Sequence, residues 1–264
     1  MCRISMLKKR VALQPAYILH RRPYRDTSLL LELFTVDFGR IALVAKGVRG
    51  ACSRRLPLLQ PLQRLLVSWT GSGTLGTLVG VEAAAAPFII SGRLAISALY
   101  LNELLLRLLH HDDGHARLFG KYEQALAALS LLEDDCRPSS SAAHTADVAT
   151  VARTEQTILR LFEKTLLEEI GYGLRLEHDA QTGEPLCEKQ RYRYVLDHGP
   201  IVAVNESSFS CYGQTLLTFA RGEVVSDDDL KALKQLMRRV IDHHLGGKPL
   251  QSRRLRLAME RGVL

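Results

Sequence analysis

The chain has 264 residues, of which 47% are hydrophobic and 24% charged, as in a globular protein of one or two domains. No apolar run is long enough to span a bilayer, and the N-terminus lacks the apolar core of a signal peptide. We therefore expect a cytoplasmic protein, associated with the nucleoid, that makes no membrane contact. The five cysteines are scattered and odd in number, without a CxxC pair, which disfavours a disulfide framework.

The net charge of +7 is segregated along the chain. Residues 1–87 carry 13 Lys/Arg against 4 Asp/Glu, and residues 230–264 carry 9 against 2. The stretch between them, residues 88–229, carries 13 against 22. Two basic ends around an acidic middle favour a polyanion as partner, although a basic surface that serves only solubility is the alternative.

The first 87 residues predict a small β-barrel. Runs at 10–19, 30–36, 40–45, 63–69 and 75–82 are apolar and β-branched, and turn signals separate them. Residues 20–26 are predicted to form a loop. No segment with helical period interrupts these runs, which is typical of a closed five-stranded barrel such as the OB-fold, a fold used to bind single-stranded nucleic acid.

The pattern becomes helical after Pro87. Apolar residues recur at helical spacing over 91–110, 116–132 and 150–170, and residues 137–144 form a Pro/Ser-rich connection. A further helix begins at Ser226, with Asp229 at the capping-box position.

Two shorter segments complete the second part of the chain. Residues 174–225 lose the helical period and predict a small β-rich insert, and the basic tail at 248–264 predicts a short helix. The expected fold class is therefore α+β, with an OB-fold domain at 1–87 followed by a mainly helical domain at 88–264.

The sequence lacks the common catalytic motifs, which disfavours an enzyme. His110, His111, Asp112, Asp113 and His115 are metal-ligating types, but they stand at a helix end next to a glycine, where solvent exposure and the helix dipole are the favoured explanation. The chain has no phosphate-binding GxxxxGK[ST] loop, no HExxH and no GxSxG motif. We therefore predict no catalytic residues, no metal and no cofactor.

Binding chemistry is concentrated in the barrel segment, where cations alternate with aromatic residues. Cations follow a phosphate backbone and aromatic rings stack on bases, which is the chemistry of single-strand binding. Phe34 and Trp69 are assigned to the core, whereas Tyr24 and Phe38 lie beside turns. The candidate DNA-binding residues are Arg21, Arg22, Tyr24, Arg25, Phe38, Arg40, Lys46, Arg49, Arg54 and Arg55, with Arg238 and Arg239 on the last long helix.

Several motifs resemble the bacterial RecO family of recombination mediators, and they occur in the same order across nearly the whole chain. They are AYILH, YRDTSLLLELFT and GRIALVAKGVRG between Ala16 and Gly50, EEIGYGL at Glu168–Leu174, RYRY at Arg191–Tyr194 and LGGKPLQSR at Leu245–Arg253.

The resemblance implies an N-terminal OB-fold and a helical domain with a zinc-finger-like insert. It implies binding to single- and double-stranded DNA and annealing of complementary strands. It also implies partnership with RecR, contact with the C-terminal tail of single-strand-binding protein, and indirect help to RecA in loading onto coated DNA.

One departure from the family concerns zinc. Many members bind zinc through two cysteine pairs in the insert, but residues 178–183 contain no cysteine and only Cys187 and Cys211 remain. The chain is thus similar to the degenerate, metal-free branch, and we expect no stoichiometric zinc. Two rival interpretations stay open, a metal-dependent enzyme acting on nucleic acid and a scaffold that binds acidic protein partners.

Overall fold

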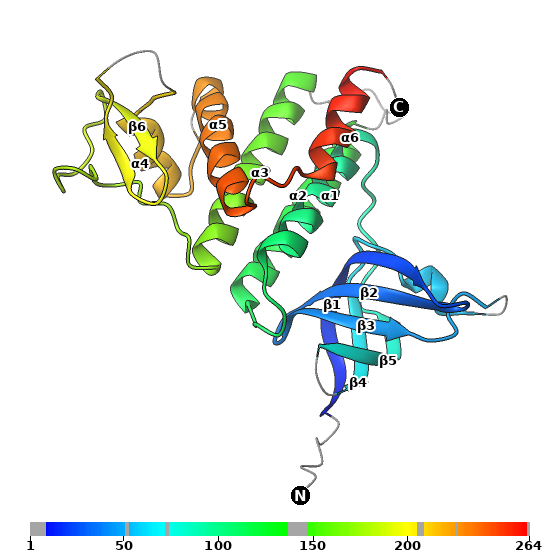
Figure 1. Ribbon diagram of the computed structural model, residues 1–264. Coiled ribbons are helices and arrows are strands. Elements are labelled where there is room, and N and C mark those ends of the chain that lie inside the picture. Colours follow the sequence, from blue (N-terminus) through cyan, green and yellow to red (C-terminus); the bar gives the residue numbers. More distant parts are fainter. Residues whose placement is uncertain are drawn as a thin grey trace, which may run out of the picture. The chain divides into compact units, whose positions relative to one another are not determined.

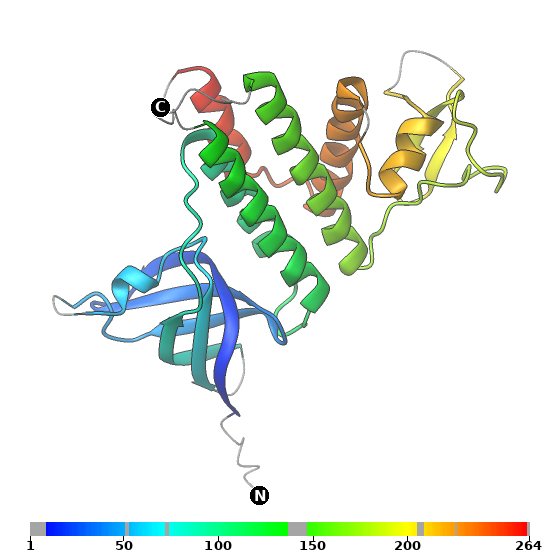
Figure 2. The same cartoon turned by 180° about the vertical axis from the view of Figure 1, so that it is seen from behind.

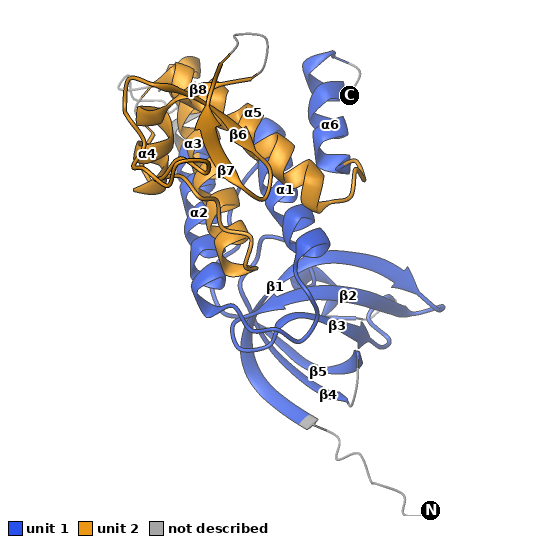
Figure 3. Cartoon of the chain, turned by 60° about the vertical axis from the view of Figure 1, so that its left-hand side comes forward, with its two compact units in different colours: residues 1–133, 250–264 blue, residues 134–249 orange. Residues whose placement is uncertain are grey.

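The computed structural model describes residues 9–50, 53–71, 74–136, 147–204, 209–224 and 226–262. They belong to two compact units, residues 1–133 with 250–264 and residues 134–249 (Figure 3). The predicted Pro/Ser-rich connection at 137–144 lies outside the described residues. No helix in the described part of the chain has the length and apolar character needed to cross a membrane.

The first unit begins with a closed barrel in the order β1-β2-β3-β5-β4, in which only β3 and β5 pair in parallel (Figure 1). This five-stranded arrangement is that of an OB-fold, as predicted. A short 3-10 turn, η1 (Leu56–Leu58), joins β3 to β4. The strands are β1 (Lys9–Tyr24), β2 (Ser28–Thr35), β3 (Gly39–Ala45), β4 (Leu65–Gly71) and β5 (Leu75–Ala83).

The first strand is longer than predicted, and the loop predicted at 20–26 is wrong. Strand β1 continues to Tyr24 and pairs with β2, with Arg21 opposite Leu31 and Arg22 opposite Leu30. Its first half pairs with β4 instead. Register shifts in both ladders allow one strand to serve two partners, because extra residues bend a strand. The turn is confined to residues 25–27.

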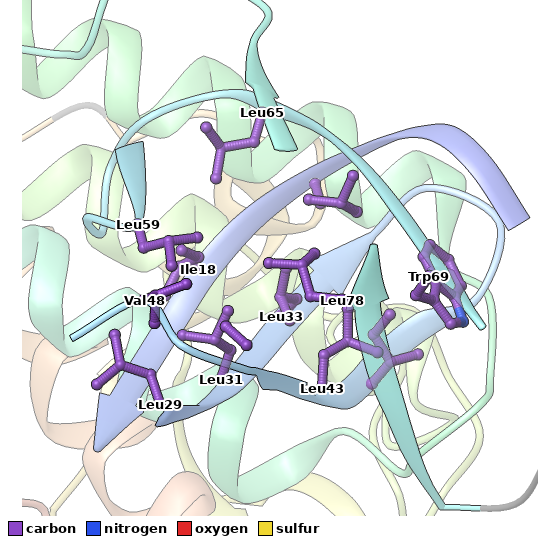
Figure 4. Packing of buried hydrophobic residues seen from close by; sticks show 14 residues of the cluster. Ile18, Leu29, Leu31, Leu33, Leu43, Val48, Leu59, Leu65, Trp69 and Leu78 are labelled. Atoms are coloured by element: carbon purple, nitrogen blue, oxygen red, sulfur yellow. The ribbon is translucent and has the colours of Figure 1, made fainter. Parts of the chain in front are cut away.

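The barrel core follows from the alternation of side chains along the strands. Leu29, Leu31 and Leu33 of β2 point inward and pack with apolar residues of the other strands (Figure 4). Val48 and Leu59 belong to the same buried cluster although both lie in connections between strands. The loop after β3 and the segment after η1 are therefore anchored to the barrel by their apolar residues.

Helices α1 (Gly92–Leu108) and α2 (Ala116–Cys136) follow the barrel in the first unit. The ring of Tyr17 on β1 lies 5.5 Å from that of Phe119 and 5.1 Å from that of Tyr122, and Phe34 on β2 lies 5.4 Å from Phe119. Asn102 of α1 accepts from the Tyr122 hydroxyl at 2.5 Å and donates to the Leu19 carbonyl at 3.2 Å. Burial raises the pKa of Tyr122, so its phenol stays a neutral donor.

The backbone of the β2–β3 turn also packs directly against the backbone of the loop between α1 and α2. A Cβ atom placed on Gly39 would lie 1.6 Å from the Asp113 carbonyl oxygen, and one on Gly114 would lie 2.4 Å from that of Asp37. The Asp112 amide donates to the Arg40 carbonyl at 3.0 Å. The histidine–aspartate cluster at 110–115 thus forms a tight contact with the barrel.

Arg40 adds a charged anchor beside this turn. Its Nε donates to Glu32 Oε2 at 2.9 Å, and its Nη1 donates to the carbonyls of Leu106 and Leu109 at 2.5 and 3.4 Å. Those carbonyls stand at the C-terminal end of α1, where the helix has no intrahelical donors left. A guanidinium suits this end because the helix dipole is negative there.

The last helix of the first unit, α6 (Gln251–Glu260), confirms the predicted short basic helix. Glu103 of α1 accepts from the amides of Gln251 and Ser252 at 2.8 and 2.9 Å, and from the Ser252 hydroxyl at 2.6 Å. These bonds satisfy donors at the helix start, so α6 is tied to α1.

The second unit holds helices and a small antiparallel sheet in the order β7-β6-β8. Tyr192 and Tyr194 of β6 pack with Phe219 and Met237 in one buried cluster. The predicted capping box is confirmed, since Ser226 and Asp229 exchange both bonds at 3.1 Å. Its elements are α3 (Val148–Glu169), β6 (Arg191–Val195), β7 (Gly199–Val202), β8 (Cys211–Tyr212), α4 (Gly213–Ala220) and α5 (Asp227–His244).

The backbone contact at Gly114 predicts a large effect of one methyl group. Gly114→Ala should lower the free energy of unfolding by about 2 kcal/mol or more, because the added carbon collides with the Asp37 carbonyl. Gly120→Ala is the matched control, because this glycine lies within α2 and its new Cβ would have open space. The control should raise the free energy of unfolding by about 1 kcal/mol, because alanine has a higher helix propensity than glycine. Urea unfolding measures both, and equal effects would contradict the close approach.

The Arg40 anchor predicts a loss of stability when its guanidinium is removed. Arg40→Ala should cost about 2 kcal/mol, because Glu32 loses a charge-assisted bond in a half-buried site. Arg22→Ala removes an exposed arginine from β1 and should change stability by less than about 0.5 kcal/mol. Thermal and denaturant unfolding of the two variants measure these changes in stability. An Arg40→Ala variant as stable as the control would show that this contact does not hold the helix.

Candidate nucleic-acid interface

The β1–β2 turn and the loop after β3 meet at one end of the barrel. The Arg49 amide donates to the Thr27 carbonyl at 2.8 Å, and the Arg49 guanidinium donates to the Arg25 carbonyl at 3.3 Å. Lys46 follows β3 directly and is exposed. The structure therefore brings together three cations that are up to 24 residues apart in sequence.

The end of β1 and the segment around η1 extend this cluster. Arg21 donates from Nη1 to the Leu59 carbonyl at 2.9 Å. The Arg25 guanidinium lies over the half-buried Tyr24 ring, 5.3 Å from its centroid. We call this end of the barrel the basic end. Its members are Arg21, Arg22, Tyr24, Arg25, Lys46 and Arg49, with the exposed Arg54 and Arg55 just before η1.

The charge of the basic end is open to an external anion. Among the described residues, none of its seven basic side chains forms an ion pair with a carboxylate. Tyr24, its one aromatic residue, lies directly before the β1–β2 turn and beside the Arg25 guanidinium. Unpaired arginines and lysines around a hairpin turn are the groups that contact phosphates.

Two of the predicted site residues lie elsewhere. Phe38 and Arg40 stand at the other end of the β2–β3 hairpin, beside the α1–α2 loop. Phe38 packs edge-on against Trp69, with ring centroids 5.2 Å apart, because the barrel core extends to this turn. The Arg40 guanidinium is already bonded to Glu32 and to α1. The structure places neither side chain in the basic end.

The outer face of the barrel also differs from a simple OB-fold surface. OB-folds commonly bind ligands on strands 2 and 3 and on the adjoining loops. Here Phe34 on the outer face of β2 is buried against Phe119 and Tyr122. Part of this strand face is therefore occupied by the chain's own helix, whereas the β1–β2 turn at residues 25–27 is exposed.

The remaining predicted site residues, Arg238 and Arg239, lie exposed on α5 in the second unit. Arg238 is 3.8 Å from the Asp242 carboxylate, whereas the Arg239 guanidinium lies 6.0 Å from the centroid of the Phe209 ring. Arg239 thus stands beside the segment that leads into β8.

Sequence reasoning missed the partners that assemble the basic end. Thr27 and Leu59 hold Arg49 and Arg21 through their backbone carbonyls. Any residue type supplies a carbonyl, so no pattern in the sequence marks these two positions.

The described titratable groups outside the barrel show no assembled metal centre. Within the described ranges, no three His, Cys, Asp or Glu side chains are grouped as metal ligands. In the insert, burial raises the pKa of the Cys211 thiol to about 11, while Cys187 is exposed. The expected lack of zinc stays a prediction.

Comparisons with known proteins agree in both halves of the chain. Residues 10–87 match the family model Recombination protein O N terminal, and residues 149–254 match Recombination protein O C terminal.

Individual relatives cover nearly the whole chain. A DNA repair protein RecO from Nitrosococcus oceani is 44% identical over 248 residues, 93% of both chains. Another, from Coxiella burnetii, is 40% identical over 250 residues, 94% of this chain and 99% of its own. Because these matches extend from the barrel through the insert to α6, the chain belongs to the RecO family.

Proposed function

We propose that this protein acts in DNA repair and recombination by binding DNA at the basic end of its barrel. The observation that carries the proposal is the convergence of seven basic side chains, none paired with a described carboxylate, on the last residues of β1 and the adjoining loops at one end of an OB-fold. Its relatives are named DNA repair proteins, which supports the same role. Such a protein would work in the cytoplasm, at the nucleoid.

The proposal extends to strand annealing. Two complementary strands repel each other, so a protein that pairs them has to neutralise charge on both. The basic end supplies one cationic surface, and Arg238 and Arg239 on α5 supply cations on the other unit. We assign binding of single- and double-stranded DNA to these surfaces and annealing to their joint action.

The protein partners in this proposal come from the family resemblance. We propose that the protein works with RecR, contacts the C-terminal tail of single-strand-binding protein, and thereby helps RecA onto coated DNA. In this role it is a binding protein without catalysis of its own. Purified RecR, the tail peptide and RecA allow each contact to be tested separately.

The first test reverses two charges of the basic end. Lys46→Glu with Arg49→Glu should weaken binding of labelled single-stranded DNA by about tenfold or more at low salt, because two phosphate contacts become repulsive. The slope of log affinity against log salt should also become shallower by about two. Fluorescence anisotropy at several salt concentrations measures both quantities.

Arg10→Glu provides the control for this test. Arg10 is exposed at the opposite end of β1, where it pairs with Thr70 of β4. The control should lose much less affinity than the double variant if the basic end carries the binding. Equal losses in the two proteins would mean that overall charge, rather than this surface, binds DNA.

The second test separates annealing from binding. Arg238→Glu with Arg239→Glu should reduce the annealing rate more than single-strand affinity, because the basic end still binds one strand. Annealing of complementary labelled oligonucleotides, with circular dichroism as a folding check, measures the ratio. Unchanged annealing in this variant would remove α5 from the proposal and leave the barrel as the annealing surface.

A further inference from the structure

We propose that the outer face of the β7-β6-β8 sheet binds a segment of single-stranded nucleic acid through Arg191, Arg193 and Tyr212. The inference rests on the proposed DNA-binding function. It adds a contact surface on the unit that does not contain the barrel.

Strand alternation separates the RYRYV sequence of β6 into two faces. Tyr192 and Tyr194 are buried, and they pack with Phe219 of α4 in the core of the unit. Arg191 and Arg193 therefore point to the opposite face and are exposed. Figures 1 and 2 show α4 against one side of this sheet, with the other side uncovered.

An aromatic ring lies on the same face as the arginines. Tyr212 of β8 stands directly opposite Arg191 in the ladder and is 50% exposed. The Arg191 guanidinium lies 4.9 Å from the centroid of the ring, and its Nε donates to Ser210 Oγ at 3.2 Å. The arginine is thus held in place against the ring, and half of the tyrosine surface is open to a base.

Arg193 supplies an available cation in the middle of this face. Arg193 is on β6, the central strand, and stands opposite Ile201 of β7. Among the described residues, its side chain makes no hydrogen bond, ion pair or ring contact. Several other cations of the unit are paired, for example Lys164 with Glu168 at 2.6 Å and Lys231 with Asp228 at 2.9 Å. An unpaired guanidinium in this acidic part of the chain is suited to a phosphate oxygen.

The combination favours nucleic acid over an acidic peptide. Base stacking on an exposed aromatic ring, reinforced by arginine and combined with phosphate contacts, is the general mode of single-strand binding. Arg191 and Arg193 are about 7 Å apart along the strand, so they reach neighbouring phosphates of one chain. An acidic peptide would use the charges but would leave the tyrosine ring without a function.

The test uses the full chain and a fluorescein-labelled oligothymidylate of about 20 nucleotides. Tyr212→Ala should weaken binding about fivefold or more through lost stacking, while Tyr212→Phe should bind like the unchanged protein. Arg193→Glu should weaken binding and make the salt slope shallower by about one. Arg221→Glu is the matched control, an exposed arginine at the end of α4, and it should have little effect.

A photo-cross-link gives a readout independent of affinity. An oligonucleotide containing 5-iododeoxyuridine should cross-link to Tyr212, as identified by mass spectrometry of the peptides. Arg193 is exposed and has no partner among the described residues, so Arg193→Glu keeps the proposal testable even if Tyr212→Ala misfolds.

Three outcomes would overturn the proposal. In the first, the variants bind like the unchanged protein and Tyr212 gives no cross-link. In the second, Arg221→Glu weakens binding as much as Arg193→Glu. In the third, Arg193→Glu abolishes binding of a labelled polyglutamate peptide but leaves DNA binding intact. If the unchanged protein bound no DNA, the proposed function itself would fail, which is a distinguishable result.

Discussion

The contact of the barrel with α1 and α2 is the constraint on which the first unit depends. Tyr17 and Phe34 place their rings against Phe119 and Tyr122, so the outer face of β1 and β2 is core rather than surface. The glycine contacts at the β2–β3 turn then allow no shift along that face. Because one strand face and one hairpin end are used for folding, a ligand is left with the loops at the other end. The position of the basic end is thus a consequence of how the barrel is buried.

The same contact divides the cations of the barrel segment into two groups. Arg40 is paired with Glu32, and Arg64 is paired with Glu123, each at 2.9 Å. Glu123 also accepts a hydrogen bond from Tyr17, whose pKa is raised mainly by burial. These arginines offset charge beside the helices and stabilise the fold. The arginines and lysine of the basic end have no such partners among the described residues, so their field extends into solvent.

Local patterns in the sequence predicted the features that local interactions determine. The apolar run at 30–36 indicated a strand, which the structure has as β2, and the Ser226–Asp229 pair marked a helix start. Features that depend on distant partners were missed. The stretch from His20 to Tyr24 is a strand because β2 pairs with it. The short helix α4 lies within the segment 174–225, for which the sequence predicted a β-rich insert. Phe38 is half-buried because Trp69, 31 positions away, receives its ring. Composition likewise identified a basic segment, but only tertiary contacts separate Arg40 from Arg49.

The insert at residues 174–225 holds its turns by hydrogen bonds. The buried Asp179 carboxylate accepts from the amides of Gln181 and Thr182 at 2.7 and 3.1 Å, which closes the first turn. The Tyr192 hydroxyl accepts from the Cys187 amide at 2.9 Å and holds the second. Cys211 is buried in the apolar cluster beneath the sheet, so its thiol packs as a small hydrophobic group. The inner face and the turns are thus satisfied within the insert. On the outer face, Arg191 bonds Ser210 and lies over the Tyr212 ring, which also joins β6 to β8. Arg193 has no side-chain partner among the described residues, so it is the member of this face that folding explains least.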